Sequence, residues 1–153
     1  MAEKSVPDKP LLNFSHARTK EQITVMRKAV DDGVCPFCRE SIESYHPKPI
    51  IREGKHWLVT ENMSPYKGAR FHFLFIYTPS HVESMSEISS EAFTELYYLL
   101  NQVRNDNRIK GGTLILRFGD NKYNGGSVSH LHAQLVVGDA DSPDYEPVRT
   151  KVG

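Results

Sequence analysis

The sequence has few cysteines, no long apolar run and no surplus of either charge. Only two of its 153 residues are cysteine, too few for the disulfide framework of a small secreted domain. No stretch approaches the roughly 18 apolar residues of a membrane span, and the polar first residues lack the apolar core of a secretory signal. We therefore expect a cytoplasmic protein that associates with no membrane.

The charge balance also argues against nucleic acid as a partner. Lys and Arg together number 19, and so do Asp and Glu, whereas nucleic-acid-binding domains usually carry a basic surplus. Hydrophobic residues make up 39% of the chain and charged residues 25%, which is typical of a globular domain. We expect a flexible N-terminal arm over residues 1–14 and a single domain over residues 15–153.

Periodicity in the sequence predicts two helices and five strands. Apolar residues at helical spacing indicate helices over residues 19–31 and near 89–105. Thr19 and Gln22 form a predicted capping box for the first helix, and Gly33 ends it. Strands are predicted over residues 50–52, 57–60, 71–77, 114–118 and 131–137, with a glycine-rich loop over 119–127 and an irregular segment over 139–153. This order indicates an α+β protein with a mostly antiparallel sheet.

The last predicted strand carries the most informative residues. Side chains alternate along a strand, so His130, His132 and Gln134 share one face. The small residues Gly125-Gly126-Ser127 precede them and allow backbone N–H groups to approach an anion. A neutral imidazole beside such a site is a competent nucleophile at phosphorus. The alternative is that the two histidines are ordinary exposed residues.

The segment from Gly125 to Gln134 resembles the signature of the histidine triad (HIT) superfamily, with Gln134 in place of the third histidine. This variant looks like the branch that contains galactose-1-phosphate uridylyltransferase and diadenosine tetraphosphate phosphorylase. The likeness extends from about Cys35 to Val137. It implies a HIT-like fold, in which a long helix packs on a curved, mostly antiparallel sheet of about five strands, and it implies a homodimer.

The resemblance also implies catalytic roles on the last strand. His132 would attack the α-phosphorus and form a covalent nucleotidyl-histidine, while its other ring nitrogen donates to the carbonyl of His130. Ser127 and the backbone near Gly126 would hold phosphate oxygens. Gln134 would hydrogen-bond the phosphate or the leaving group.

Nucleotide binding is implied for Gly125, Gly126, Ser127 and Asn62. Asn62 matches the family's ribose-binding position, although a turn residue before Ser64-Pro65 is an equal alternative. The family usually has an Asn eleven residues before the first triad histidine. Here Gly119 holds that position, with Asp120 and Asn121 beside it, and the segment His72–His81 is one residue longer than usual.

Cys35 and Cys38 form half of a zinc site, because two thiolates on one short turn reach the same ion. The resemblance implies His81 and His130 as the other two ligands. Four protein ligands leave no open position, so this zinc would be structural. A redox-active pair and an unligated pair remain alternatives. His16, His46, His56 and His72 have no partner in the motif, and we expect surface or packing roles for them; His72 lies in the central strand.

The predicted function is nucleotidyl transfer or hydrolysis at the α-phosphate of a dinucleoside polyphosphate or a nucleotide sugar. One alternative is a plain hydrolase of dinucleoside polyphosphates or nucleoside phosphoramidates. Another is a zinc-containing, nucleotide-binding module with little turnover. A glutamine cannot do acid–base work near pH 7, so Gln134 favours substrates whose leaving group departs as a stable anion.

Overall fold

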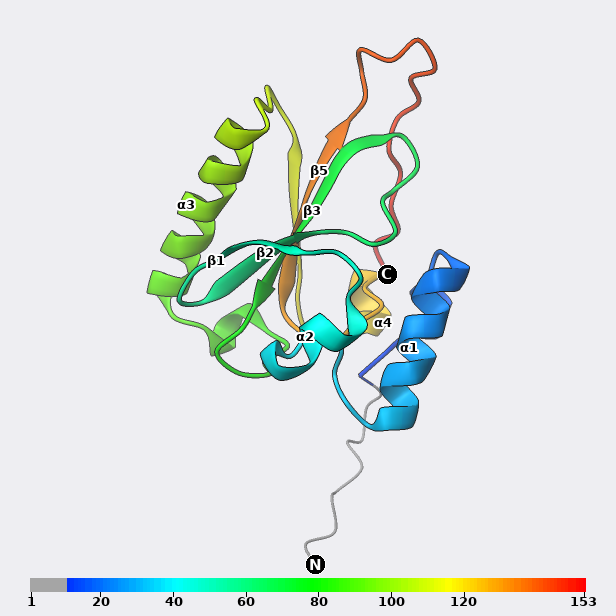
Figure 1. Cartoon of the computed structure of the whole chain (residues 1–153), viewed down its shortest axis with the longest axis vertical. Coiled ribbons are helices and arrows are strands. Elements are labelled where there is room, and N and C mark those ends of the chain that lie inside the picture. The colour runs from blue at the N-terminus through cyan, green and yellow to red at the C-terminus, as the bar shows by residue number, and fades with distance from the viewer. Residues whose placement is uncertain (1–10) are drawn as a thin grey trace, which may run out of the picture.

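The computed structural model describes residues 11–153, which form a five-stranded sheet flanked by helices on both faces (Figure 1). The strand order is β1-β2-β3-β5-β4, and each neighbouring pair is antiparallel. The strands are β1 (Ile50–Glu53), β2 (Trp57–Glu61), β3 (Ala69–Tyr77), β4 (Thr113–Arg117) and β5 (His132–Gly138). The predicted α+β class and the five antiparallel strands are confirmed.

Two of the helices were predicted and two were not. The helices are α1 (Lys20–Asp32), α2 (Arg39–Tyr45), α3 (Ser90–Asp106) and α4 (Asn121–Asn124), with 3₁₀ turns at Phe14–His16 and Met85–Glu87. The predicted segments 19–31 and 89–105 correspond to α1 and α3. The helix α2 was not predicted, because seven residues are too few to display a helical apolar stripe. Residues 121–124, which form α4, were predicted as part of a glycine-rich loop.

The ends of α1 follow the local signals in the sequence. Thr19 Oγ1 accepts a hydrogen bond from Gln22 N at 3.1 Å, and Gly33 ends the helix in the left-handed conformation at φ 67°. The second half of the predicted capping box is wrong. Gln22 Oε1 accepts from Arg18 N at 3.0 Å instead of from the N-cap residue itself, so the cap extends one residue further upstream.

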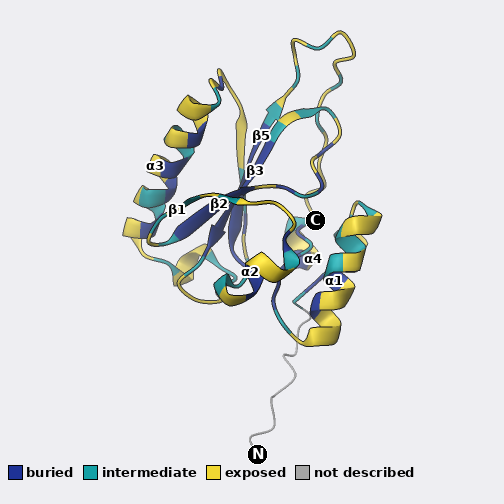
Figure 2. Ribbon diagram, in the orientation of Figure 1, coloured by how far each residue is buried: buried dark blue, intermediate teal, exposed yellow. Residues whose placement is uncertain are grey.

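The helix α3 covers one face of the sheet and encloses the main hydrophobic core. Figure 2 shows α3 buried along the side that faces the strands and exposed on the opposite side. Trp57 Nε1 donates to the carbonyl of Ala92 at 2.8 Å, which ties β2 to the start of α3. The core between them includes Val59, Phe73, Phe75, Leu96, Leu99, Val103, Ala133 and Leu135.

The other face of the sheet carries the polar side chains of β5. Ala133 and Leu135 point into the α3 core, so the alternating residues His132 and Gln134 point to the opposite face. His130 precedes β5 instead of lying in it, because the strand begins at His132. Two smaller apolar clusters cover this face: Ile42, Leu58, Leu74 and Ile76 under α2, and Leu12, Met26, Ala29, Cys35 and Val128 under α1.

Both ends of the described chain return to the loop that precedes β5. Of the arm expected over residues 1–14, residues 1–10 lie outside the described part. Leu12 is buried and bridges to Val128, and Asn13 N donates to Ser127 O at 2.8 Å, so residues 11–14 are held against the body of the protein. The C-terminal segment has no helix or strand, as predicted, and it ends beside α4 and α1 (Figure 1).

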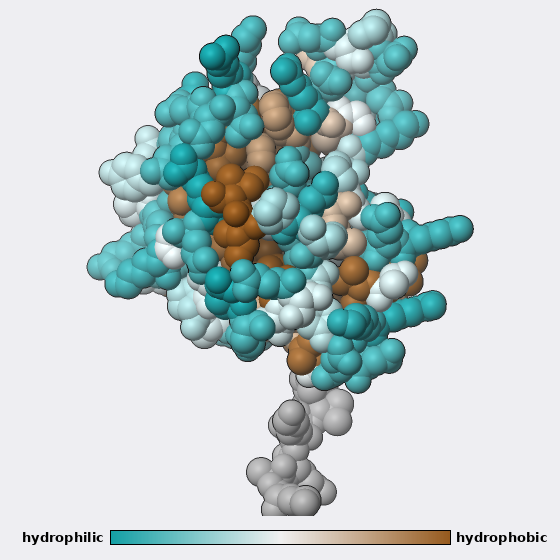
Figure 3. Space-filling model, in the orientation of Figure 1, coloured by the Kyte–Doolittle hydropathy of each residue, from teal (hydrophilic) through white to brown (hydrophobic). Residues whose placement is uncertain are grey.

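The surface is largely hydrophilic on the face drawn in Figure 3, apart from an apolar band near α3 and β1. Ile51 of β1 is among the exposed large apolar residues. Within residues 11–153, no helix combines the length and the hydropathy that crossing a membrane requires.

Candidate active site

His132 is a buried, neutral imidazole at the start of β5. Its Nδ1 donates to the carbonyl of His130 at 2.7 Å, so Nε2 is the unprotonated nitrogen. Burial lowers the pKa of His132 to about 4, because removal from water disfavours the charged form. The ring of Phe37 packs edge-on against it at 5.1 Å between centroids. The imidazole is thus fixed in orientation and tautomer.

A cavity opens beside His132, between the sheet and α1, and its empty space, part of which is open solvent, is about 730 Å³. The residues predicted for catalysis and nucleotide binding all line it: Asn62, Gly125, Gly126, Ser127, His132 and Gln134. The sequence therefore identified one wall of the cavity. The opposite wall comes from His16, Arg18, Gln22, Val25 and Met26, which the sequence analysis did not connect to the site.

His72 fixes the orientation of the Gln134 carboxamide. Tyr66 N donates to His72 Nδ1 at 3.2 Å, so the neutral ring carries its proton on Nε2. That Nε2–H donates to Gln134 Oε1 at 2.6 Å. The Gln134 oxygen therefore faces His72, and the two hydrogens on Gln134 Nε2 remain available to a ligand in the cavity.

His72 itself is buried on β3, where the sequence analysis expected only packing. Burial lowers its pKa to about 4, despite the hydrogen bond to Gln134, and the charges of Arg18 and Arg117 act in the same direction as burial. The register pairs Leu74 with Gln134 and His72 with Val136. His72 thus lies diagonally from Gln134 on one face. This contact depends on the register of two strands, which no local motif reveals.

Asn62 acts as a turn residue and still reaches the cavity. Its Oδ1 accepts from Ser64 N at 2.7 Å, which is the turn role considered from the sequence. Its Nδ2 lies 3.2 Å from His72 Nε2. Both nitrogens carry hydrogen in the tautomer above, so the Asn62 amide hydrogens stay available to a ligand in the cavity.

The glycine-rich loop is held by contacts that the sequence analysis did not foresee. Gly126 N donates to Asn124 Oδ1 at 2.8 Å, so this N–H is engaged within the loop. Gly126 O accepts from His16 Nδ1 at 2.9 Å. Gln22 Nε2 donates to Ser127 Oγ at 2.8 Å, which leaves the Ser127 hydroxyl proton as a donor toward the cavity.

Tyr66 links two arginines to the site. Its ring stacks on His72 at 4.5 Å, and the Arg18 guanidinium lies 4.2 Å from the ring centroid. Arg117 Nη2 and Thr150 Oγ1 both donate to the Tyr66 hydroxyl. Burial raises the pKa of Tyr66, but these hydrogen bonds and the two positive charges outweigh burial and lower the pKa overall.

The four predicted metal ligands come together at one point. One ligand atom each from Cys35, Cys38, His81 and His130 lies within 4.8 Å of the others. The His130 Nδ1 atom is 3.5 Å from Cys35 Sγ, 3.7 Å from Cys38 Sγ and 3.2 Å from His81 Nδ1. Ligands at tetrahedral angles around zinc would be about 3.3–3.8 Å apart. These distances fit one zinc ion.

A second contact prepares His130 for a metal. Its Nε2 donates to the carbonyl of Tyr77 at 2.6 Å, so Nδ1 is unprotonated and faces the sulfur atoms of Cys35 and Cys38. Such a backbone acceptor is the usual partner of a metal-bound imidazole. The cluster joins the segment before α2, the segment after β3 and the residue two positions before His132.

Two of the remaining histidines serve the framework. His46 Nε2 is 2.9 Å from Thr60 Oγ1 and from Glu61 O, which anchors the end of α2 to β2. His56 N and Nδ1 both contact Glu95 Oε2, which joins the β1–β2 hairpin to α3. Their packing roles agree with expectation.

Solved structures of histidine triad proteins share this fold. A HIT family hydrolase from Clostridium thermocellum is 28% identical, with a TM-score of 0.56, and the match covers 72% of this chain and 95% of that one. A zinc-bound histidine triad family protein from Mycobacterium smegmatis is 18% identical over 75% of this chain and 81% of that one, with a TM-score of 0.54. A histidine triad nucleotide-binding protein from Candida albicans is 16% identical over 76% and 85%, with a TM-score of 0.56. No family profile matches this sequence, and no curated protein is significantly similar to it. The predicted HIT-like fold is confirmed.

Proposed function

We propose that this protein is an enzyme of the histidine triad superfamily that processes nucleotides at the α-phosphate, with His132 as nucleophile. The observation that carries the proposal is the fixed, neutral His132 at the wall of a cavity that Gln134, Ser127 and Asn62 also line. The likeness to a protein named as a HIT family hydrolase supports an enzyme. An imidazole held by a backbone carbonyl is ready for attack through Nε2.

The reaction is a double displacement. The Nε2 lone pair of His132 forms a bond to the α-phosphorus while the bond from phosphorus to the leaving oxygen breaks, and the leaving group takes that electron pair. The acceptor oxygen then attacks phosphorus and the P–N bond breaks, which restores His132. Gln134 Nε2 and the Ser127 hydroxyl donate to the non-bridging oxygens as charge develops on them.

Transfer to an anionic acceptor is the favoured outcome, as in the branch with galactose-1-phosphate uridylyltransferase and diadenosine tetraphosphate phosphorylase. The Gln134 amide donates hydrogen bonds but cannot transfer a proton to a leaving group near pH 7. His72 also holds the Gln134 oxygen away from the reacting atoms. Leaving groups that depart as stable anions need no such proton. A dinucleoside polyphosphate or nucleotide sugar therefore suits the site better than a phosphoramidate, whose amine must be protonated.

The zinc ion would be structural in this scheme. Cys35, Cys38, His81 and His130 would fill all four positions, so no open position would remain for substrate or water. The bound metal would contribute folding free energy. The four ligands would also fix the position of His130, whose carbonyl accepts the hydrogen bond from His132 Nδ1.

We also propose a cytoplasmic homodimer that binds no nucleic acid. The strand β4 pairs on one side only, with β5, and unpaired edges favour association. Two large apolar side chains are exposed at this edge, Leu114 of β4 and Phe118 directly after it. Sedimentation analysis of the wild type and of Leu114→Lys tests the dimer, which the lysine should weaken.

The mechanism is tested by the mass of the intact protein after mixing with substrate. Wild type with a dinucleoside polyphosphate or nucleotide sugar should gain one nucleotide, and His132→Ala should gain none and lose turnover by about 10⁶-fold. His56→Ala is the matched control, because His56 contacts Glu95 away from the cavity. An adduct of normal yield in His132→Ala would overturn the assignment.

The acceptor is tested on the same adduct. Phosphate or a sugar phosphate should discharge it quickly, water should discharge it slowly, and Gln134→His should shorten its life in water. Rapid hydrolysis with no detectable adduct, and no acceleration by any acceptor, would indicate a plain hydrolase. Binding of nucleotides without adduct or turnover across the whole panel would indicate a nucleotide-binding module.

A further inference from the structure

A second cavity adjoins the one beside His132. Its empty space, part of which is open solvent, is about 680 Å³, and it shares His16, Arg18, Tyr66 and Gly125 with the first. The two cavities therefore adjoin at a shared edge formed by these four residues.

The lining of the second cavity is cationic. The residues that line the second cavity but not the first are Ala17 and the C-terminal residues Arg149, Thr150 and Lys151. Arg18, Arg149 and Lys151 give the second cavity three permanent positive charges, and none of its described lining residues is acidic. The whole chain has no net charge, so this concentration is a local feature.

The charges here are not neutralised by carboxylates within residues 11–153. No ion pair among the described residues involves Arg18, Arg117, Arg149 or Lys151. Partial loss of water and the charge of Arg117 both lower the pKa of Arg18, while the Tyr66 phenol acts in the opposite direction. Cations held close together are stabilised when an anion joins them.

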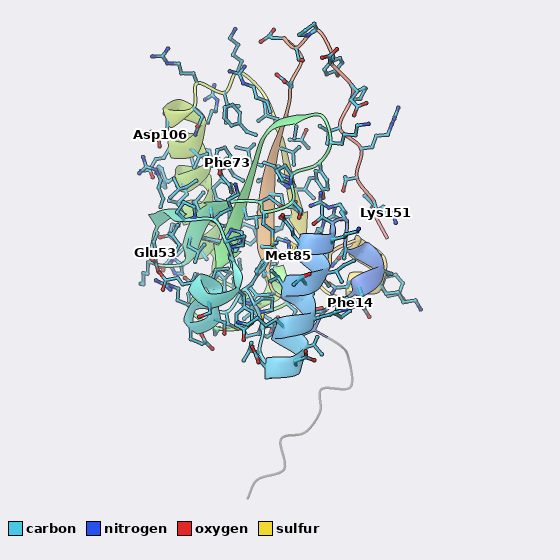
Figure 4. All side chains as sticks on the ribbon, turned by 45° about the vertical axis from the view of Figure 1, so that its right-hand side comes forward. Phe14, Glu53, Phe73, Met85, Asp106 and Lys151 are labelled. Carbon is cyan, nitrogen blue, oxygen red and sulfur yellow. The ribbon has the colours of Figure 1, made fainter. Side chains whose placement is uncertain are left out.

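Arg117 shows how the cavity is built. It is buried, and its described hydrogen bonds go to neutral acceptors only: the carbonyls of Asn124 and Lys151, the Tyr66 hydroxyl and Thr150 Oγ1. These bonds dock the C-terminal tail against the loop before β5. Figure 4 shows Lys151 on the same side of the molecule as Phe14, where the tail meets the N-terminal segment.

We propose that the second cavity is a subsite for the distal phosphates of a polyphosphate substrate. This inference rests on the proposed function and makes it narrower, because it assigns the substrate class as nucleotides with a chain of several phosphates. The α-phosphate lies at His132, and the next phosphates cross the shared edge at His16 and Arg18. The terminal phosphates then contact Arg149 and Lys151.

The test is equilibrium binding of inorganic tripolyphosphate and of orthophosphate to the full chain by titration calorimetry at fixed ionic strength. Wild type should bind tripolyphosphate at least about ten-fold more tightly than orthophosphate. The double variant Arg149→Gln/Lys151→Gln should lose about ten-fold or more in tripolyphosphate affinity, since each exposed cation contributes a few-fold. Its orthophosphate affinity should change far less.

The matched control is Arg104→Gln/Lys110→Gln, which removes the same charge from exposed positions at the far end of α3 and the connection after it. Equal tripolyphosphate affinities in the two double variants would overturn the subsite. His132→Ala should keep wild-type tripolyphosphate binding at the distal subsite while it loses the nucleotide adduct. If His132 forms no adduct with any substrate but tripolyphosphate still binds as expected, the proposed reaction fails and the anion subsite stands.

Discussion

Protonation of His72 should cost the protein much of its stability in mild acid. The pKa of His72 is about 4 in the folded protein and 6.5 in its unperturbed state. The unfolded chain therefore binds this proton at a higher pH than the folded one. The stabilising effect is complete above about pH 6.5, is lost progressively as the pH falls toward about 4, and changes no further below that.

The size of the effect follows from the shift in pKa. A difference of about 2.5 pKa units corresponds to about 3 kcal/mol at full protonation, and to roughly 2.5 kcal/mol near pH 4.5. Among the groups that face His72, the hydrogen bond to Gln134 favours the charged ring, but burial and the two arginines outweigh it. Arg18 and Arg117 are cations, and Tyr66 N already occupies the Nδ1 lone pair that a second proton would need.

The perturbation is His72→Gln, in which an amide can accept from Tyr66 N and donate to Gln134 but does not titrate. Urea unfolding of both proteins, followed by the fluorescence of the single tryptophan, Trp57, gives the free energy of unfolding near pH 7.5 and near pH 4.5. Wild type should lose about 2.5 kcal/mol more than the variant over this interval. The other titrating groups are common to both proteins, and their contributions cancel apart from the charge coupling between His72 and His132. An equal loss in the two proteins would refute the link between burial and the His72 pKa.

Three other changes have defined outcomes. Purified protein should hold about one zinc per chain by elemental analysis, and Cys35→Ser should lower both metal content and melting temperature; metal-free fresh protein that ignores chelators would contradict this. Gly125→Ala should destabilise by about 1–3 kcal/mol in urea unfolding, because φ is 74° and an added Cβ would collide with Lys151 O and Arg117; wild-type stability would contradict it. Arg117→Met should release the C-terminal tail, so limited proteolysis with mass analysis should show faster cleavage beyond Tyr145, while unchanged cleavage would show that Arg117 does not anchor the tail.

The parts of the fold that the sequence predicted depend on local signals. The helix start at Thr19 and its end at Gly33 need only neighbouring residues, and the strands show as apolar runs. The Cys35–Cys38 spacing predicts half of a metal site by itself. His81 and His130 followed from the likeness to known proteins, and the structure brings them within reach of the two thiols.

The missed features depend on contacts between distant parts of the chain. His16 and Gly126 are 110 positions apart, and Tyr66 and Thr150 are 84 apart. Nothing in either local sequence marks the other member of the pair. The hydrogen bond from Gly126 N to Asn124 was not predicted for a similar reason, because Asn124 ends a short helix that was predicted as part of a loop.

The same distant contacts determine when the loop before β5 can form during folding. The antiparallel partners β2 and β3 are close in sequence, so closing the chain between them costs little entropy. The loop before β5 instead depends on two non-local contacts, one with the segment around Asn13 and His16 and one with the tail around Thr150. Non-local closures slow folding and yield the regions that open most easily. A chain emerging from a ribosome delivers the tail around Thr150 after β5, so the sheet can form before the cavity beside His132 is complete. Within residues 11–153, we expect the amide hydrogens of this loop to exchange with solvent sooner than those of the central strands.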